Sequence, residues 1–371
     1  MPNSSYFPQK IYIEEGSLDY PLTQKILDKS GRIPKEIIRN PQEIIQELHD
    51  SKDWIGEGKK FLLLAKQRGR FVKPCPCTPR YIGCNYFIIN LVFNCPLDCT
   101  YCILQDYLSH PLITVFINLE DLWRELDVFL QKREGKYLRI GTGELGDSLV
   151  LDHLTENSKD LISYFRNKEK AVLELKTKTV EIKNILEIKP ADNVVISWSL
   201  NAFKIAEEEE KKAPRVEERI KAALRVSEKG FKLGFHFDPL IRYPGWEEEY
   251  AEVIRILLNT VDPHGISWIS LGSLRFPPSL KPLIKKRFPR IKIIYDEFIK
   301  GKDGKLRYFK PLRLELYQKI VSFIKGAGGE MIPLYFCMES EAIWKKVMDW
   351  APKEKEDVES FLSPWSNQLD F

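Results

Sequence analysis

Six of the seven cysteines in this 371-residue chain lie between positions 75 and 102, and three of them have a spacing that suits metal chemistry. Cys95, Cys99 and Cys102 form a C-x3-C-x2-C motif within one short segment. Three thiolates at this spacing can bind three irons of a four-iron, four-sulfur cluster. The fourth iron then has no protein ligand and is free to bind and reduce a small molecule. The motif therefore predicts a 4Fe-4S cluster at Cys95, Cys99 and Cys102.

Two other interpretations of these cysteines stay open. A zinc site would need a fourth ligand, which Cys75, Cys77 or Cys84 could supply. The three residues of the motif could also be buried thiols without a metal. Disulfides are not expected, because the first ten residues lack the apolar stretch of a secretory signal, and we therefore expect a cytoplasmic protein. No role is predicted for Cys75, Cys77 and Cys84.

The cysteine motif directly follows the first of several apolar, β-branched segments that are typical of buried strands. These segments are residues 87–93, 113–117, 137–140, 171–175, 193–200, 231–237 and 266–271. Helical patterns lie between most of them, for example at residues 216–228, which are closed by Gly230. Repeated strand–helix units predict parallel strands with right-handed crossovers. We therefore expect an α/β fold with a full or partial (β/α) barrel, whose carboxyl-end mouth carries the motif.

Prolines and changes of pattern divide the chain into three predicted regions. Residues 1–85 are expected to be a helical extension that ends in a Pro/Cys-rich loop at residues 73–80, where three prolines interrupt any helix. Residues 86–276 carry the predicted barrel. Residues 277–371 contain Lys302-Asp303-Gly304 between two apolar runs, a pattern typical of a β-hairpin.

A second candidate binding segment, Gly141-Thr142-Gly143-Glu144, follows the predicted strand at residues 137–140. Glycine lets a backbone approach a ligand closely, and a carboxylate can accept hydrogen bonds from an ammonium group. An ordinary glycine turn has the same residues. Its place after a barrel strand, like that of the cysteine motif, favours a binding role for Gly143 and Glu144.

With the aromatic residue Tyr101 before its third cysteine, the motif resembles the signature of radical S-adenosylmethionine (radical SAM) enzymes. Further short matches resemble the spore photoproduct lyase family, whose members are radical SAM enzymes that reverse a thymine dimer in DNA. They are residues 95–107, 113–121, 147, 152–155, 175–178, 197–201, 234–239, 245–247 and 274–276. The resemblance implies a 4Fe-4S cluster, S-adenosylmethionine, a 5′-deoxyadenosyl radical and an electron donor for the cluster.

The resemblance also implies roles for single residues. Cys95, Cys99 and Cys102 match the cluster ligands, whereas Lys178 and Ser199 match positions near the cofactor. Lyases of this family return a hydrogen atom to the product radical with a cysteine and with two tyrosines that flank the third cluster cysteine. Here Tyr101 is kept, but Ile103 and Glu144 stand at the positions of the second tyrosine and the cysteine. The usual relay is therefore expected to be missing, and no catalytic residue is assigned.

Positive charge is concentrated in one part of the chain. The net charge is only +4, but residues 281–313, here called the basic segment, hold twelve Lys or Arg against three acids. Such a segment is typical of a phosphate-binding surface, although a solvated lysine-rich surface has the same composition. Together with the resemblance it favours a nucleic acid partner. No apolar run approaches the roughly 18 residues of a membrane span, so no membrane partner is expected. The oligomeric state is not predicted.

Three functions are consistent with these features. The first is a radical SAM enzyme that acts on DNA or another nucleic acid. The second is a nucleic-acid-binding protein without catalysis, stabilised by zinc. The third is a radical SAM enzyme with a protein or small-molecule substrate, in which the basic segment is only a solvated surface.

Overall fold

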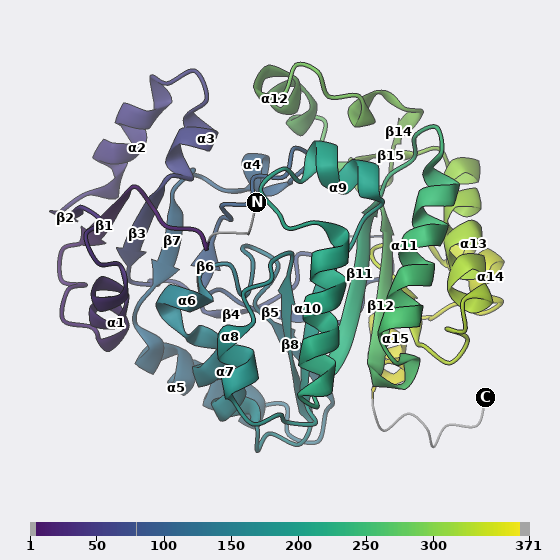
Figure 1. Ribbon diagram of the computed structural model, residues 1–371, viewed down its shortest axis with the longest axis horizontal. Helices are drawn as coiled ribbons and strands as arrows, with labels where there is room; N and C mark the ends of the chain where they lie inside the picture. The colour runs from purple at the N-terminus through teal and green to yellow at the C-terminus, as the bar shows by residue number, and fades with distance from the viewer. Residues whose placement is uncertain (1–4, 79, 364–371) are drawn as a thin grey trace.

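An open, curled sheet of eight strands forms the centre of the molecule (Figure 1). The computed structural model describes residues 5–78 and 80–363; residues 1–4, Pro79 of the Pro/Cys-rich loop and residues 364–371 lie outside the described part. From one edge to the other the strands are β16 (Leu334–Phe336), β12 (Ile266–Ser273), β11 (Lys232–Leu240), β10 (Val194–Ser199), β9 (Ala171–Thr177), β8 (Leu138–Gly141), β5 (Phe87–Ile89) and β4 (Val72–Pro74).

Parallel pairing joins all neighbours in this sheet except β4 and β5, which are antiparallel. Among the described strands, β16 and β4 form the two edges and do not pair with each other. The sheet is therefore a half-barrel, and the predicted α/β fold is confirmed with a partial (β/α) barrel.

Helices that connect the strands cover the outer face of the half-barrel, and the longer ones bury an apolar stripe against it. They are α5 (Leu119–Gln131), α7 (Asn157–Phe165), α8 (Lys183–Glu187), α10 (Val216–Glu228), α11 (Trp246–Thr260) and α13 (Lys310–Gly326). In α10, Ile220, Ala223 and Val226 are buried. This helix is followed by Gly230 at a φ of +104°, a conformation that favours glycine, as the sequence predicted.

The N-terminal part contains strands as well as helices, where the sequence predicted helices. A five-stranded sheet has the order β2 (Lys35–Ile38), β1 (Lys10–Glu14), β3 (Phe61–Ala65), β7 (Ile113–Phe116) and β6 (Val92–Phe93). Three helices lie in this part: α1 (Pro21–Lys29), α2 (Pro41–His49) and α3 (Trp54–Gly58).

Strand β7 was predicted to belong to the barrel, and this prediction is wrong, because β7 pairs with β3 and β6. All four of its residues are buried, and such a continuous apolar run does not identify the sheet to which a strand belongs. The predicted strand at residues 87–93 is likewise divided between the two sheets, as β5 and β6.

The predicted hairpin of the C-terminal part is confirmed. Strand β14 (Phe298–Lys300) pairs antiparallel with β15 (Leu306–Tyr308), and β13 (Arg275–Phe276) pairs with β15 on its other side. Gly304 in the connection has a φ of +80°. The apolar run before the turn is not one strand: Ile293–Tyr295 form the 3-10 helix η2, and β14 begins only at Phe298.

The remaining helices are short. They are α4 (Leu104–Tyr107), α6 (Asp152–Thr155), α9 (Phe203–Glu209), η1 (Pro263–Gly265), α12 (Leu280–Arg287), α14 (Glu341–Met348) and α15 (Lys355–Phe361). Among the described residues, no helix has the length and apolar character needed to cross a bilayer.

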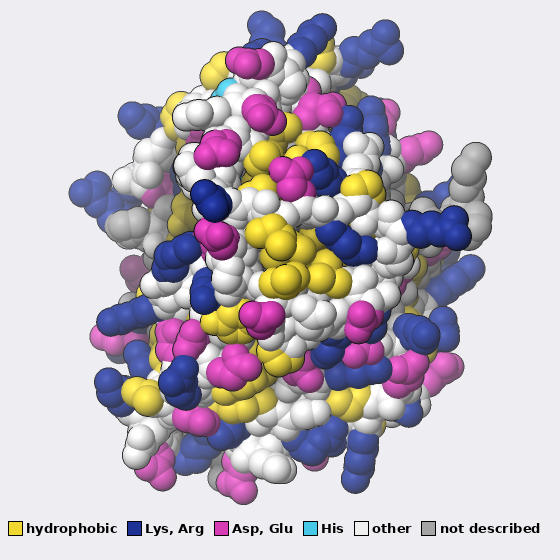
Figure 2. Space-filling view, turned by 90° about the vertical axis from the view of Figure 1, so that its left-hand side faces the viewer, with side chains coloured by type: hydrophobic (Ala, Val, Ile, Leu, Met, Phe, Trp, Pro, Cys, Tyr) yellow, Lys and Arg dark blue, Asp and Glu magenta, His cyan; other side chains and the backbone are white. Residues whose placement is uncertain are grey.

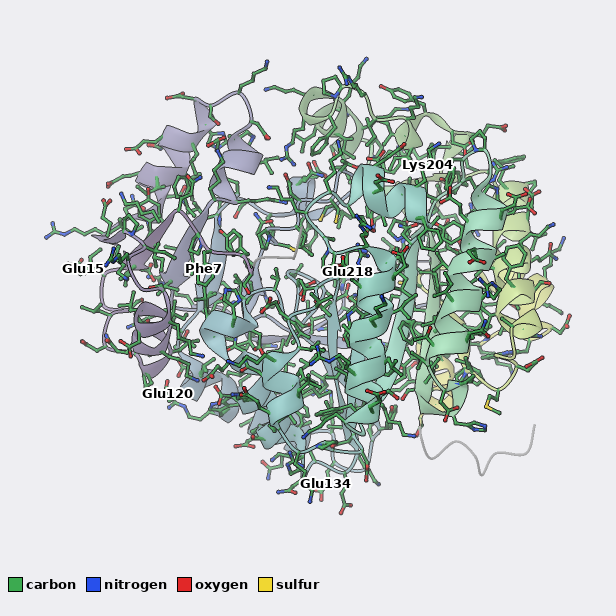
Figure 3. All side chains as sticks on the ribbon, viewed as in Figure 1. Phe7, Glu15, Glu120, Glu134, Lys204 and Glu218 are labelled. Atoms are coloured by element: carbon green, nitrogen blue, oxygen red, sulfur yellow. The ribbon has the colours of Figure 1, made fainter. Side chains whose placement is uncertain are left out.

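Charged side chains cover the outside of the molecule, as Glu15, Glu120 and Glu134 illustrate in Figure 3. On the face that carries the N-terminal sheet, acidic and basic side chains are interspersed around a small hydrophobic area (Figure 2). That face therefore has no concentration of positive or negative charge, whereas the basic segment has an excess of positive charge.

Candidate functional site

A cavity of about 620 Å³ lies where the carboxyl ends of several half-barrel strands meet the cysteine motif. All seven predicted site residues line it: Cys95, Cys99, Cys102, Gly143, Glu144, Lys178 and Ser199. Gly143 and Glu144 follow β8, Lys178 follows β9, and Ser199 ends β10. In parallel sheets with helical crossovers, ligands bind at this end of the strands.

The segment from Asn94 to Cys102, here called the cluster loop, is held by side chains that bond to its backbone. Asn94 accepts a hydrogen bond from the N–H of Cys95 (2.8 Å) and donates one to the carbonyl of Pro111 (2.7 Å). The amide of Gln105 donates to the carbonyls of Thr100 (2.9 Å) and Cys102 (3.1 Å). The path of the loop is therefore set before any ligand binds.

Two thiols of the cluster loop, those of Cys95 and Cys99, are affected by burial. Burial raises the pKa of Cys95 well above its usual range and raises that of Cys99 to about 12. Both therefore carry protons at neutral pH, and metal binding would have to displace them.

The three cysteines supply a donor set that suits a cluster. A 4Fe-4S cluster takes each thiolate on a different iron, and three thiolates leave its fourth iron open. Cys95, Cys99 and Cys102 line one cavity, so one group of this size could bind all three. In the described part of the chain, no group of three Cys, His, Asp or Glu side chains is arranged to hold a single metal ion.

Lys178 does not face solvent freely, because its ammonium lies 3.0 Å from the carboxylate of Glu210. Glu210 also pairs with Arg219 at 2.6 Å and accepts a hydrogen bond from the hydroxyl of Tyr101. Burial alone would raise the pKa of Glu210, but the two cations lower it to about 2. Glu210, which the sequence analysis missed, is the buried anion that holds Lys178 at the cavity wall.

Gly143 has a packing reason to be glycine. An added Cβ would lie 2.7 Å from the Cβ of Lys176 and 2.9 Å from its carbonyl oxygen, so strand β9 leaves no space for a side chain. The next residue, Glu144, forms an ion pair with Lys176. Burial would lower the pKa of Lys176, but Glu144 and Glu174 raise it. Lys176 was missed because nothing in its sequence context distinguishes it from a solvated lysine.

The remaining cysteines lie on the same side of the molecule. Cys75 lines the cavity, and its thiol is hydrogen-bonded to that of Cys77. Cys84 is buried. Cys337 does not line the cavity; its sulfur accepts a hydrogen bond from Arg275 at 3.2 Å.

The basic segment borders this cavity. Lys305 of the hairpin lines it, as do Arg275 and Pro277 just before the segment. Arg275 is occupied by Asp238, with two hydrogen bonds of 3.0 and 3.1 Å. Tyr107 at the cavity is 56% exposed and presents an unpacked aromatic ring.

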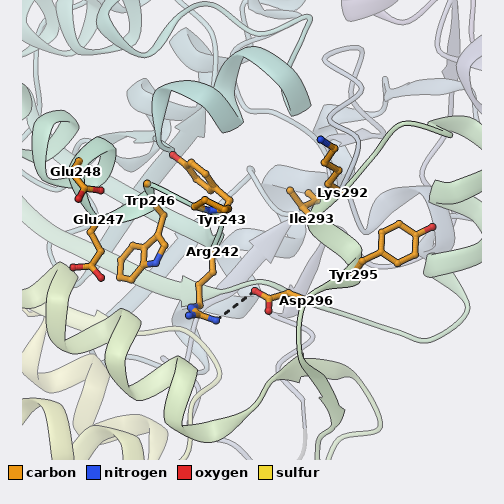
Figure 4. Close-up of a pocket in the computed structure, with 11 residues that line it drawn as sticks. Arg242, Tyr243, Trp246, Glu247, Glu248, Lys292, Ile293, Tyr295 and Asp296 are labelled. Carbon is orange, nitrogen blue, oxygen red and sulfur yellow. Dashed lines mark ion pairs between the residues drawn. The ribbon is translucent and has the colours of Figure 1, made fainter.

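A second hollow of about 620 Å³ lies outside the half-barrel, between the start of α11 and η2 (Figure 4). Arg242 and Asp296 point toward each other across it and form an ion pair of 3.6 Å. None of the predicted site residues lines this hollow.

Comparison with known proteins identifies the family of the chain. Residues 6–314 match the spore photoproduct lyase family. The chain is 27% identical to a spore photoproduct lyase of Bacillus subtilis over 306 residues, which cover 79% of this chain and 85% of that protein. It is 25% identical to one from a Geobacillus species, over 79% of this chain and 86% of the relative.

Solved structures share the fold. A spore photoproduct lyase variant superposes with a TM-score of 0.80 at 24% identity, over 90% of this chain and all of that one. Another variant, with bound AdoMet and dinucleoside spore photoproduct, superposes with a TM-score of 0.77 over the same shares. By its match over most of its length, the chain belongs to the spore photoproduct lyase family of radical SAM enzymes.

Proposed function

We propose that this enzyme binds a 4Fe-4S cluster through Cys95, Cys99 and Cys102, cleaves S-adenosylmethionine and starts the radical repair of a lesion in DNA. One observation carries the proposal: the same cavity is lined by the three cysteines and by Lys305 of the basic segment. A cofactor and a phosphate-bearing substrate can therefore meet there.

The proposal includes a cytoplasmic location and an electron donor for the cluster. Since the family consists of enzymes, the alternative of a zinc protein without catalysis has no support.

The bound cofactor would supply the radical chemistry through a 5′-deoxyadenosyl radical, and the protein supplies binding and orientation. We assign Glu144 to the ammonium and Lys178 to the carboxylate of S-adenosylmethionine, because these two opposite charges line the cavity. The Ser199 hydroxyl, at the end of β10, is placed to bind the ribose. Gly143 lets the segment after β8 approach β9 closely at Lys176, which keeps Glu144 beside Lys176.

The hydrogen atom that completes repair needs a donor other than the usual relay. Ile103 has no abstractable polar hydrogen, and the hydroxyl of Tyr101 is engaged by the buried Glu210. Among the described cysteines that line the cavity, Cys75 is the one outside the C-x3-C-x2-C motif. We assign it as the donor: its S–H bond breaks, a C–H bond forms on the product radical, and a thiyl radical is left on Cys75.

Anaerobic reconstitution with metal analysis tests the cofactor assignment. We expect about four irons per chain and release of 5′-deoxyadenosine when reductant and S-adenosylmethionine are added. Cys99→Ala should lose both, whereas Cys337→Ser, which changes a thiol that does not line the cavity, should keep both. Zinc in place of iron without cofactor cleavage would overturn the proposal.

The substrate assignment is tested with DNA that contains spore photoproduct. Wild-type enzyme should convert the lesion to thymines, and in D2O the product should take up deuterium, because the Cys75 thiol exchanges with solvent. Cys75→Ala should still cleave S-adenosylmethionine but should not form normal product. Cleavage of the cofactor without any change in the lesion would favour a protein or small-molecule substrate instead.

A further inference from the structure

Asp98, between the first two cysteines of the cluster loop, is held by two buried cations from outside the loop, and the exposed Lys212 lies at 3.8 Å. The ammonium of Lys59 lies 2.8 Å from one of its carboxylate oxygens, and the guanidinium of Arg287 lies 3.0 Å from the other. The side chains of Lys59 and Arg287 are only 2% and 3% exposed. Charges removed from water to this extent need partners, so the three groups fix one another in place.

Arg287 is also linked to the loop through Gln105 of α4. Its guanidinium donates to the side-chain oxygen of Gln105. Gln105 in turn donates through its amide nitrogen to the carbonyls of Thr100 and Cys102. The contact with Arg287 orients the amide, because it engages the oxygen and leaves the nitrogen directed at the loop backbone. Arg287 thus reaches the cluster loop through Asp98 and through Gln105.

The same guanidinium joins two other regions of the molecule. It donates to both carboxylate oxygens of Asp53, at 2.7 and 3.2 Å. Asp53 caps the start of α3 by accepting from the N–H of Gly56 (3.0 Å). Arg287 itself belongs to α12 in the basic segment, where Lys285 and Lys286 are exposed. One side chain therefore connects α3, the cluster loop and α12.

We propose that Arg287 is a positioning residue for the cluster: it sets the geometry of the loop that carries Cys95, Cys99 and Cys102. The proposal rests on the assignment of these cysteines as cluster ligands. A planar guanidinium that bridges two carboxylates and an amide fixes their relative orientation, which a lysine ammonium, a single point charge, does not. Lys285 and Lys286 on α12 are exposed to solvent, whereas Arg287 on the same helix is buried against the loop.

The test compares Arg287→Gln and Arg287→Lys with the wild-type enzyme after identical anaerobic reconstitution. Residues that support metal ligands from outside typically change metal affinity by about 10-fold or more when they are replaced. We expect a loss of cluster affinity of this size in Arg287→Gln, together with a changed electron paramagnetic resonance spectrum of the reduced cluster. Arg287→Lys should retain the charge but not the wild-type spectrum. Arg255→Gln, which removes an exposed arginine from α11, is the matched control.

Two further variants keep the test decisive if Arg287→Gln unfolds. Gln105→Leu leaves every charge in place and removes only the hydrogen bonds of the Gln105 amide, those to the loop backbone and the one from Arg287. It should therefore change the spectrum without a large loss of stability. The double variant Arg287→Gln/Asp98→Asn should lose less cluster affinity than the sum of its single variants, because the two residues act on each other.

The outcomes separate the two proposals. If the wild-type enzyme binds no iron, the cofactor assignment fails and the role of Arg287 fails with it. If the wild-type enzyme binds iron, and Arg287→Gln and Gln105→Leu match its iron content and spectrum, the cofactor assignment stands and Arg287 is only a structural residue.

Discussion

The cavity wall and the basic segment use charge in opposite ways. At the cavity wall, Glu210 is fully buried and contacts Lys178 and Arg219. In the basic segment, seven of the twelve cations are exposed: Lys285, Lys286, Arg290, Lys292, Lys300, Lys302 and Lys310. Buried paired charges fix geometry but are costly to desolvate, whereas exposed cations are free to meet phosphate. The buried ion pairs at the cavity therefore suit the orientation of side chains, and the exposed cations of the basic segment suit the binding of phosphate.

Three arginines of the basic segment belong to the first kind. Arg287 pairs with Asp53 and Asp98, Arg307 with Asp303, and Arg313 with Glu339. Their side chains are at most 6% exposed. The local excess of positive charge is therefore carried to the surface by the lysines and Arg290, and the buried arginines hold the fold together. Composition alone does not separate the two groups.

The comparison predicts its largest effect at Glu210. Glu210→Ala leaves the buried Arg219 and the half-buried Lys178 without their anion. We expect a loss of about 3–5 kcal/mol in the free energy of unfolding, measured with urea. The control is Glu252→Ala, which removes the exposed partner of Arg255 and should hardly change stability. Equal losses in the two variants would mean that burial of the ion pair does not matter.

The pH dependence of stability sharpens the same point. The pKa of Glu210 is lowered to about 2 in the folded protein, against an ordinary value of 4.5. Its ionised form therefore stabilises the protein fully above pH 4.5, and the contribution is lost as the pH falls toward 2. The difference in unfolding free energy between wild type and Glu210→Gln should shrink below pH 4.5. A difference that stays constant there would show that Glu210 is not held as an ionised partner.

The sequence predicted the parts of the site that are local in the chain. Cys95, Cys99 and Cys102 lie within eight positions, and Gly143 and Glu144 follow a recognisable strand, so their common cavity could be foreseen. The half-barrel and the hairpin were predicted for the same reason, since periodicity and turn residues are local signals. The roles of the site residues and the domain limits at residues 85 and 276 stay predictions.

The missed residues owe their place to contacts between distant segments. Glu210 lies in a run of charged residues that is typical of a solvated surface, and only the fold brings it to Lys178. Lys59 meets Asp98 from 39 positions away, and Arg287 meets it from 189. Strand β7 was assigned to the wrong sheet because a continuous apolar run does not show with which strand it pairs. Tertiary pairing decided each of these cases.

A smaller effect is expected from Gly143→Ala at the cavity wall. The new methyl group would meet Lys176 of β9 at 2.7 Å, and both strands are fixed by the sheet. We expect a loss of about 1–3 kcal/mol in unfolding free energy from overpacking. Gly326→Ala at the end of α13 is the matched control, because nothing lies within 4 Å of the added Cβ. That change should be neutral or stabilise by up to about 1 kcal/mol. Equal effects would remove the packing reason for Gly143.

The smallest effect on stability, and the most direct test of the exposed region, comes from Lys285→Gln/Lys286→Gln. Both side chains are exposed on α12, so unfolding free energy should change by less than about 0.5 kcal/mol. Duplex DNA binding should weaken, and the slope of log affinity against log salt should become shallower by about 1 for each phosphate that the variant no longer binds.

The control is Lys345→Gln/Lys346→Gln, which changes two adjacent exposed lysines on α14 and should leave the slope unchanged. If both pairs change the slope equally, DNA binds the overall charge of the protein and the basic segment has no special part in recognition. If only the α12 pair changes it, DNA phosphates bind on the helix whose buried Arg287 holds the cluster loop.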